Sequence, residues 1–298
     1  MRTLISGASG LVGSALVESL HAKGHDIRCL QRHKKPGSAD IWNTSELYSR
    51  DSGEEPFDTV IHLAGENVAR GRWTSILKDK IMTSRVEGTR QLVEYLATLA
   101  TPPRTFLCAS AVGFYGSRGD ELLTEKSSMG KGFLAEVCGR WEQEASRAES
   151  FGARVVNLRF GMVLSPHGGA LGKLLLPFKA GLGGPIGKGR QYMSWISIRD
   201  LVEIVDFVIH AEALHGPVNV VAPEAVTNKE FTGCLGRAVQ KPAILPVPPL
   251  ALRLLLGDMA DEMLLTSSRV KPEKLLEAGY CFEDADLEET LRFCVQRK

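Results

Sequence analysis

The sequence has almost no surplus of charge. Its 298 residues hold 36 Lys and Arg against 35 Asp and Glu, which leaves a formal net charge of +1. A strong field of one sign is what draws proteins to nucleic acid or to anionic membranes. The balance therefore predicts no nucleic-acid partner and no membrane partner, and any basic patch must be local.

The cysteines and histidines lack the spacing of a zinc site or of a disulfide framework. The six cysteines stand at positions 29, 108, 138, 234, 281 and 294 and form no C-x-x-C pair. None of the seven histidines stands near them at the spacing of metal ligands. We therefore expect no metal, and reduced thiols in a cytoplasmic protein.

Long hydrophobic runs are missing as well. No segment reaches the ~18 consecutive apolar residues of a membrane-spanning helix, and the N-terminus lacks the pattern of a signal peptide. Apolar residues make up 44% of the chain and charged residues 24%. This composition predicts a soluble protein with one large domain, or with a main domain and a smaller companion.

The sequence opens on a pattern typical of a nucleotide-binding turn. An apolar run over residues 3–5 leads to glycines spaced as G-x-x-G-x-x-G, and leucines then recur at helical spacing. Gly7 can turn where a Cβ atom would clash, Gly10 lets the backbone approach a pyrophosphate, and Gly13 lets the helix pack on the strand. Glycine-rich turns are often only turns, but this position between strand and helix favours dinucleotide binding. The residues expected to line the site are Gly7, Ser9, Gly10, Leu11, Val12 and Gly13.

The end of the next strand predicts which dinucleotide is bound. Residues 26–31 read as a strand that ends in Arg32, His33, Lys34 and Lys35. An acidic residue there would bind the 2′-hydroxyl of the adenine ribose and repel a 2′-phosphate, whereas Arg accepts the phosphate. The missing acid and the cations favour NADP(H), with Arg32 as the main contact. The alternative is a solvated basic turn that binds no ligand.

The elements that follow alternate between strand and helix. A short apolar strand over residues 58–63 leads into a small-residue turn, Leu63-Ala64-Gly65, which is expected to line the same crevice. The further elements expected from periodicity are helices over 73–100, 171–182 and 199–211 and strands over 105–110, 154–158, 192–198 and 217–221.

This alternation predicts an α/β fold, a Rossmann-like doubly wound parallel sheet with a small, mostly helical C-terminal domain. The expected domains are an NADP-binding domain of 1–165 and about 199–222, and a cap or substrate domain of about 166–198 and 223–298. Thr227 is the expected N-cap of a helix with Glu230 at the capping-box position. Residues 250–256 form the most apolar helix and are expected in the core, although a partner or a membrane surface could use them.

Several motifs together resemble those of the extended short-chain dehydrogenase/reductases. In order they are Gly7-x-x-Gly10-x-x-Gly13, Leu63-Ala64-Gly65, Val86 to Thr89, Ser110 to Gly116, Leu158 to Gly161 and Trp195 to Leu201. Later stretches at 183–191, 246–257 and 278–280 are similar to those of epimerase-family proteins, with their C-terminal domain of unknown function. The resemblance implies a Rossmann-like sheet and an NADP-type dinucleotide.

The chain departs from this family where the family performs its acid/base chemistry. Catalytic members carry a Ser or Thr before a Tyr-Gly pair, and a Tyr-x-x-x-Lys one helix later. Alignment of the surrounding motifs places Ala111 at the Ser/Thr position and Glu136 and Arg140 at the Tyr and Lys positions. An Arg cannot exchange protons near neutral pH, because its pKa lies above ~12. Glu136 could act as a base only if burial raised its pKa, and an exposed helix carboxylate is the simpler interpretation.

Tyr115 and Ser110 are the candidate catalytic residues that remain. Tyr115 is the only hydroxyl-bearing aromatic residue near the expected nicotinamide edge, and Ser110 could assist it by hydrogen bonding. The alternative is a tyrosine that only shapes the site. The family fold would bring Arg85, in place of the family's Asn, and Arg140 near the cofactor, where either could hold a phosphate or carboxylate. The alternative for Arg85 and Arg140 is a surface ion pair. Val163, in the turn after the strand over 154–158, would face the nicotinamide.

Two functions remain open at this point. The first is an atypical oxidoreductase or epimerase-like enzyme that moves a hydride between the nicotinamide and a small carbonyl, alcohol or sugar-nucleotide-like substrate. The second is an NADPH-binding regulatory or interaction protein without the usual Ser-Tyr-Lys catalysis. Both predict a cytoplasmic monomer or homodimer.

Overall fold

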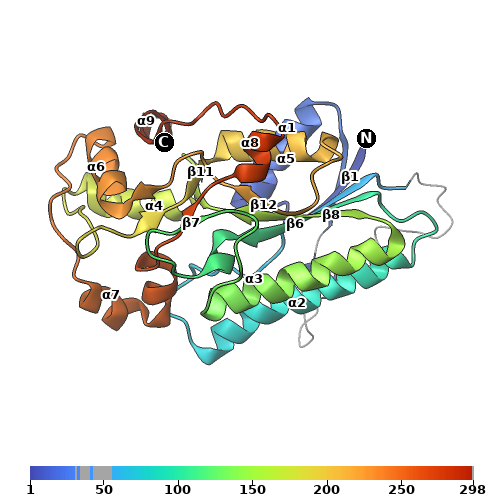
Figure 1. Cartoon of the computed structure of the whole chain (residues 1–298), viewed down its shortest axis with the longest axis horizontal. Helices are drawn as coiled ribbons and strands as arrows, with labels where there is room; N and C mark the ends of the chain where they lie inside the picture. Colours follow the sequence, from blue (N-terminus) through green and yellow to red (C-terminus); the bar gives the residue numbers. More distant parts are fainter. Residues whose placement is uncertain (31, 34–40, 43–55, 297–298) are drawn as a thin grey trace.

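A parallel sheet of six strands forms the centre of the molecule (Figure 1). The computed structural model describes residues 1–30 and 56–296, and the backbone alone of 32–33 and 41–42. The strand order is β12-β8-β6-β5-β1-β2, and all neighbouring strands run parallel. The strands are β1 (Arg2–Ser6), β2 (Asp26–Leu30), β5 (Thr59–His62), β6 (Thr105–Ala111), β8 (Arg154–Phe160) and β12 (Gly216–Val220).

The chain enters this sheet near one edge and builds it in two directions. β1 pairs with β2 on one side and with β5 on the other, so the strand order reverses between β1 and β5. This arrangement confirms the doubly wound parallel sheet predicted from the sequence. In such sheets ligands bind outside the carboxyl ends of the strands at the point of reversal. The glycine turn after β1 and the small-residue turn after β5 both lie at that point.

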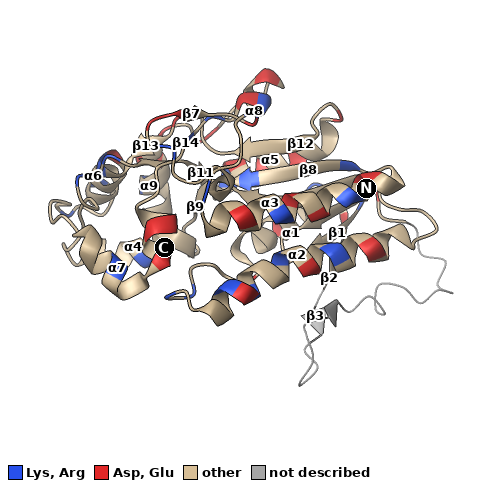
Figure 2. Ribbon diagram, turned by 60° about the horizontal axis from the view of Figure 1, so that its bottom comes forward, with Lys and Arg blue, Asp and Glu red and all other residues tan. Residues whose placement is uncertain are grey.

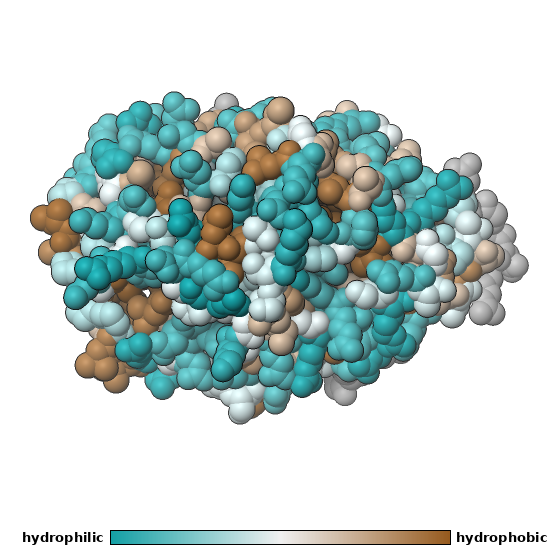
Figure 3. All heavy atoms as spheres, in the orientation of Figure 1, coloured by the Kyte–Doolittle hydropathy of each residue, from teal (hydrophilic) through white to brown (hydrophobic). Residues whose placement is uncertain are grey.

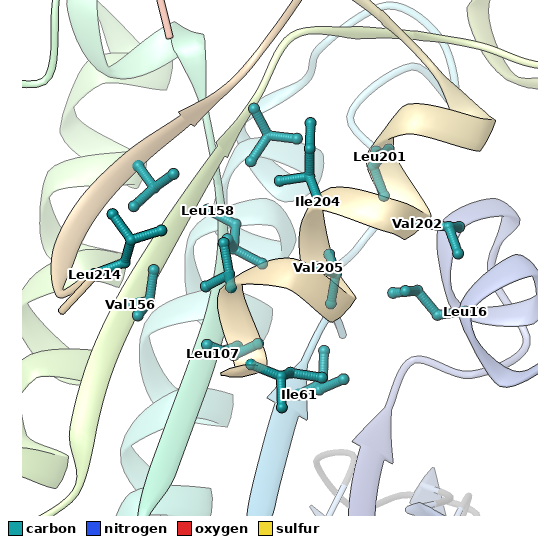
Figure 4. Packing of buried hydrophobic residues seen from close by; sticks show 14 of the residues in the cluster. Leu16, Ile61, Leu107, Val156, Leu158, Leu201, Val202, Ile204, Val205 and Leu214 are labelled. Atoms are coloured by element: carbon teal, nitrogen blue, oxygen red, sulfur yellow. The ribbon is translucent and has the colours of Figure 1, made fainter. Parts of the chain in front are cut away.

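Helices cover both faces of the sheet (Figure 1). One face carries α1 (Leu11–Ala22) and α5 (Ile198–His210), and the other carries α2 (Ser75–Ala97) and α3 (Phe133–Ser146). Figure 4 shows how Leu16 of α1 and Val205 of α5 pack toward strand residues such as Ile61. All three side chains are fully buried. Burial of apolar surface on both faces therefore holds the layers together.

The start of α5 illustrates why the helices begin where they do. The Ser197 hydroxyl accepts a hydrogen bond from the Asp200 N–H at 2.9 Å, which satisfies one of the open amides of the first turn. Buried residues then recur at Leu201, Ile204 and Val208, so one stripe of the helix faces the sheet. The predicted N-cap at Thr227 is confirmed in the same way, with a capping box.

A second apolar cluster lies beside the sheet. It joins residues of β11 (Trp195–Ser197), α4 (Gly169–Lys179), α6 (Asn228–Ala238) and α9 (Leu287–Gln296). In Figure 1, α4, α6 and α7 lie together at the left, away from the N-terminus at the right. Most of this cluster comes from the two stretches that the sequence assigns to the second domain, and the exact division stays a prediction.

The remaining elements are short. They are β3 (Arg32–His33), β4 (Ile41–Trp42), β7 (Leu122–Leu123), β9 (Met162–Leu164), β10 (Tyr192–Met193), β13 (Val226–Thr227), β14 (Arg269–Val270), α7 (Pro249–Leu256) and α8 (Glu273–Glu277), with single turns over 112–115, 147–151 and 260–264. The strand expected over 192–198 is two strands, because β10 pairs with β13 whereas β11 pairs with β9. None of the described helices is both long and apolar enough to cross a membrane.

The expectation that the apolar helix near residue 250 belongs to the core is wrong. No residue of α7 is buried. Leu250, Leu254 and Leu255 are 66%, 69% and 70% exposed. Figure 3 shows hydrophobic atoms at the lower left, over the position of α7 in Figure 1. The helix is apolar nearly all round, so composition alone could not indicate which side, if any, would be covered.

Two identical substitutions test this division between core and surface. Leu201→Ala should lower the free energy of unfolding by about 2–5 kcal/mol, because it leaves a cavity between α5 and the sheet. Leu250→Ala should change it by less than about 0.5 kcal/mol, because the side chain is exposed. Urea unfolding followed by circular dichroism measures both. Equal losses of stability in the two variants would contradict the exposed position of α7.

Candidate functional site

The glycine turn brings three segments into backbone contact. Gly7 has a φ of +75°, a conformation that other residues rarely adopt. A Cβ atom on Gly7 would lie 2.9 Å from the backbone nitrogen of Ala64, and one on Gly13 would lie 2.2 Å from the Gly7 carbonyl oxygen. Only glycine fits at either position. The ends of β1 and β5 and the first turn of α1 are therefore packed backbone to backbone.

Gly10 has a different role, because space is open around it. It is exposed, and a Cβ atom there would meet only the Gly7 carbonyl oxygen, at 3.3 Å. It is also the N-cap of α1, and no side chain in the described part of the chain caps this helix. The first-turn amides are left to a ligand or to water, and the positive end of the helix dipole favours a phosphate. Ser9 is exposed beside Gly10, whereas Leu11 and Val12 are half-buried.

Arg85 of α2 lies against the turn that follows β5. A Cβ atom on Gly65 would lie 2.8 Å from the central carbon of the Arg85 guanidinium, so this glycine makes room for the cation. Arg85 Nη1 donates to the carbonyl oxygens of Glu66, at 2.9 Å, and Ile81, at 3.3 Å. The guanidinium also stacks over the Trp141 ring at 5.0 Å. Burial lowers the pKa of Arg85.

No carboxylate pairs with Arg85 within the part of the chain that the structure describes. A guanidinium has five N–H donors, and the two carbonyl contacts use only Nη1. A largely buried cation without an acidic partner is suited to an anionic or strongly polarised ligand group. Arg85 therefore lies beside Gly65, and its expected contact with the cofactor stays a prediction.

The segment around α4 reaches across the glycine turn. A Cβ atom on Gly169 would lie 2.8 Å from Cδ2 of Leu11, and 3.9 Å from the carbonyl oxygen of Val163. Lys173 Nζ donates to the carbonyl oxygen of Ala69, in the loop after β5. Helix α4 thus contacts both turns that follow β1 and β5. Val163 is half-buried in β9, within this same group of residues.

The inward face of α3 does not carry the residues that the sequence alignment expected. A Cβ atom on Gly113 would lie 3.2 Å from Cβ of Leu134 and 3.9 Å from the Cys138 sulfur. Leu134 and Cys138 are four residues apart, as are the Tyr and Lys of the family motif. Burial raises the pKa of Cys138 to about 11, so the thiol stays protonated at neutral pH.

The placement of Glu136 and Arg140 at the Tyr and Lys positions is therefore wrong. Both side chains are about half exposed and form an ion pair with each other at 2.6 Å. They belong to the outer surface of α3, where charges of both signs alternate (Figure 2). The alignment was anchored on Trp141 and Glu142, which put the Tyr-x-x-x-Lys motif two residues late. A shift of two residues moves a side chain by about 200° around a helix. Arg140 is a surface ion-pair residue, as the alternative interpretation held.

Tyr115 lies inside the protein instead of at an open edge. Its side chain is fully buried, and its hydroxyl donates to Asn219 Oδ1 at 2.7 Å. The same hydroxyl accepts a hydrogen bond from Arg159 Nη1 at 2.8 Å. Burial raises the pKa of Tyr115. A hydroxyl that is already bonded on both sides favours the alternative interpretation, a tyrosine that shapes the site.

Ser110 belongs to the same buried network. Its hydroxyl donates to Glu142 Oε1 at 2.6 Å. Arg159 forms a bidentate ion pair with the Glu142 carboxylate. Its Nε donates to Oε1 at 2.8 Å, and its Nη2 donates to Oε2 at 2.7 Å. Burial opposes the charge on Arg159, but the hydrogen bonds and attraction of Glu142 outweigh it and raise the pKa of Arg159. Arg159 also lies over the Phe114 ring at 3.5 Å.

Several residues of this network were not predicted from the sequence to have a role in the site. Arg159 stood in a quoted motif but received no role, and Asn219 was read only as part of a strand. Cys138 and Glu142 are four residues apart on α3, so helical spacing alone could have placed them on one inward face. The predicted role of Arg32 lies outside the described residues, because the structure describes only the backbone of Arg32, in β3.

Known protein families and solved structures that match this chain are consistent with its fold and its glycine turn. The pattern of the NAD dependent epimerase/dehydratase family matches residues 3–222, and that of a domain of unknown function, DUF1731, matches residues 247–294. The chain belongs to the NAD-dependent epimerase/dehydratase family. The expected resemblance to this family, with its C-terminal domain of unknown function, is confirmed.

Relatives in this family cover the whole chain. The epimerase family protein MT2273 of Mycobacterium tuberculosis is 40% identical over 98% of this chain and 97% of its own length. The human epimerase family protein SDR39U1 is 35% identical over 98% of this chain and 99% of its own length. A crystal structure of human SDR39U1 (isoform 2) with NADPH superposes with a TM-score of 0.88, at 33% identity over 99% of each chain.

The different environments of the three glycines give a direct test. Gly10→Val should abolish binding of a dinucleotide and leave the fold intact, because its side chain would occupy the approach of the pyrophosphate. Gly13→Val should instead disrupt the fold, because its Cβ atom alone would overlap the Gly7 carbonyl. Calorimetric titration and thermal unfolding distinguish the two effects. A folded Gly10→Val variant with unchanged affinity would remove this turn from the site.

Proposed function

We propose that this chain is an NADPH-dependent reductase whose hydride transfer uses no tyrosine-lysine relay. One observation carries this proposal. The glycine turn and the open N-terminus of α1 are built for a dinucleotide, whereas the inward face of α3 presents Leu134 and Cys138. The structure of the human relative with NADPH supports NADP(H) as the cofactor.

In this proposal, separate groups of the chain would bind the cofactor and stabilise charge on the substrate. The amides at the start of α1 would hold the pyrophosphate, and Gly10 would let the backbone approach it. The cofactor supplies a hydride to the substrate. Arg85 would stabilise negative charge that develops on the substrate, because it is largely buried and has no acidic partner in the described part of the chain. The proton would come from water, since the Cys138 thiol is a weak acid and the Tyr115 hydroxyl is engaged elsewhere.

This division of labour favours a particular class of substrate. A small, electron-poor carbonyl compound accepts a hydride without being protonated first, and Arg85 could stabilise its oxygen as charge develops. Epimerisation of a sugar nucleotide needs removal of a hydroxyl proton, for which this face of α3 has no base. We therefore favour a small carbonyl over a sugar nucleotide. Contacts of α4 with both turns support a cap over the site, with water admitted as the source of the proton.

A second function is an NADPH-binding regulatory or interaction protein without turnover. The exposed leucines of α7 favour it, since an apolar helix face that is open to solvent is typical of surfaces that bind other proteins. Both functions fit a cytoplasmic location, because all six cysteines are free thiols.

Turnover measurements distinguish the reductase from its alternatives. The wild type should oxidise NADPH with an activated dicarbonyl such as phenanthrenequinone, and it should not epimerise UDP-glucose. Arg85→Met should lower kcat by roughly tenfold or more, because the developing charge loses its partner. Tyr115→Phe, if folded, should keep kcat within about threefold. Loss of a true general acid costs about 10²–10⁴-fold, so such a loss in Tyr115→Phe would contradict the water-derived proton.

The outcome also separates the two functions. Tight NADPH binding with no oxidation of NADPH by any carbonyl of a broad panel would favour the regulatory function. Robust epimerisation of a sugar nucleotide would contradict both.

The choice of cofactor rests on Arg32 and is tested by one charge reversal. NADPH should bind roughly ten- to a hundredfold more tightly than NADH, because a charge-assisted hydrogen bond is worth about 1.5–3 kcal/mol. Arg32→Asp should weaken NADPH binding and spare or improve NADH binding, since the carboxylate repels the phosphate and accepts the ribose hydroxyl. Calorimetry of both cofactors measures the change, with Lys241→Asp, an exposed cation of the C-terminal part, as the matched control. Equal affinities in the wild type would refute this basis for cofactor choice.

A further inference from the structure

Two histidines and an aspartate meet at the end of the sheet opposite to the glycine turn. Asp206 and His210 stand one turn apart on α5, and His25 lies in the turn between α1 and β2. One ligand atom from each residue lies within 4.8 Å of the other two. The next residue after His25 begins β2, and its N–H donates to the carbonyl oxygen of Met1. The cluster therefore lies at the amino ends of the strands, far from the candidate cofactor site.

The distances within this cluster are close to those of a metal site. His25 Nε2 and His210 Nδ1 each lie 3.8 Å from Asp206 Oδ1. Nitrogen and oxygen ligands bind Zn²⁺ at about 2.0–2.2 Å in tetrahedral geometry, which sets neighbouring ligands about 3.3–3.6 Å apart. Small side-chain movements would close the difference. His210 is the most exposed of the three, so its ring is free to make the largest movement.

The carboxylate of Asp206 has one satisfied and one unsatisfied oxygen. Oδ2 accepts a hydrogen bond from Lys23 Nζ at 2.7 Å. Oδ1 is buried and has no hydrogen-bond partner among the described residues. A buried carboxylate oxygen without a donor is costly and calls for a water molecule or an ion. Oδ1 is also the atom that faces both histidine rings.

The histidines are suited to act as ligands. The side chain of His25 is only 8% exposed, so its ring is held in place beside Asp206. A neutral imidazole is the form that binds a metal ion. The other ring nitrogen of His25 lies 3.4 Å from the Thr3 hydroxyl, a contact that would orient the ring. His210 Nδ1 lies 2.9 Å from the carbonyl oxygen of Asp206 and would exchange this contact for the metal.

We propose that His25, Asp206 and His210 form a binding site for a zinc-like divalent cation. Two imidazole nitrogens and one carboxylate oxygen favour Zn²⁺ over Mg²⁺ or Ca²⁺, which prefer oxygen ligands. Water would complete the coordination, since His210 is exposed. The ion would tie the turn before β2 to α5 and so stabilise the native fold, because the ligands come together only in the folded chain.

The sequence could not reveal this site, because His25 lies about 180 residues from its partners and only the fold unites them. The Asp206 to His210 spacing is a helix i, i+4 pair, which by itself is common on helix surfaces. The site does not depend on the proposed reductase function.

Zinc titration of the untagged, EDTA-treated protein tests the proposal. Calorimetry with ZnCl2 should show one saturable site per chain, and the melting temperature should rise with ZnCl2 but not with MgCl2. His210→Ala should weaken zinc binding by about tenfold or more, because it removes a ligand from the surface without disturbing the core. His215→Ala is the matched control, since this exposed histidine lies outside the cluster, and it should leave binding unchanged.

A second variant tests the role of the carboxylate. Lys23→Met removes the cation that competes for Asp206 and should tighten zinc binding by roughly two- to fivefold. Absence of saturable zinc binding would overturn the proposal. So would equal binding in His210→Ala and the wild type, or a Lys23→Met variant that binds zinc more weakly.

Discussion

Backbone-to-backbone packing at the end of β1 is the constraint on which the rest of the site depends. Gly7 and Gly13 cannot be replaced by larger residues, because a Cβ atom at either position would overlap main-chain atoms that cannot move aside. This contact fixes the start of α1 next to the turn after β5, at the point where the strand order reverses. Gly10, which is free of such contacts, is then left facing outward with the open helix end. Three glycines of one motif thus serve two purposes, close packing and access for a phosphate.

The second feature is a closed polar network beside the inward face of α3. Glu142 and Arg159 satisfy each other, and they engage Ser110 and Tyr115 as well. Such a network is stable because every buried charge has a partner, and breaking one side would leave an unpaired charge in the interior. The hydroxyls that could donate protons are therefore part of the scaffold. Arg85, on a different helix, is a largely buried cation with no carboxylate partner among the described residues.

The sequence predicted the order of elements and the glycine turn well, because hydrophobic periodicity and glycine spacing are local signals. It failed where the answer depended on which side of a helix faces inward. Glu136 and Arg140 were put two residues out of place by alignment to a short neighbouring motif, an error that a helix converts into the opposite face. The prediction that α7 is buried was wrong for a related reason. A helix that is apolar nearly all round has no polar face to show which side is exposed. The role of Arg32 stays a prediction from charge, because the structure describes only its backbone.

The central claim is that this chain keeps a dinucleotide site but has no proton relay beside it. A crystal structure of the protein with NADP⁺ tests this most directly, through the side chains that lie within about 4 Å of the nicotinamide ring. The account predicts that Leu134 and Cys138 lie on the α3 side of the ring, and that no tyrosine or serine hydroxyl is within hydrogen-bonding reach of the reacting position. A Tyr115 hydroxyl released from Arg159 and pointing at that position, at about 3 Å, would contradict it.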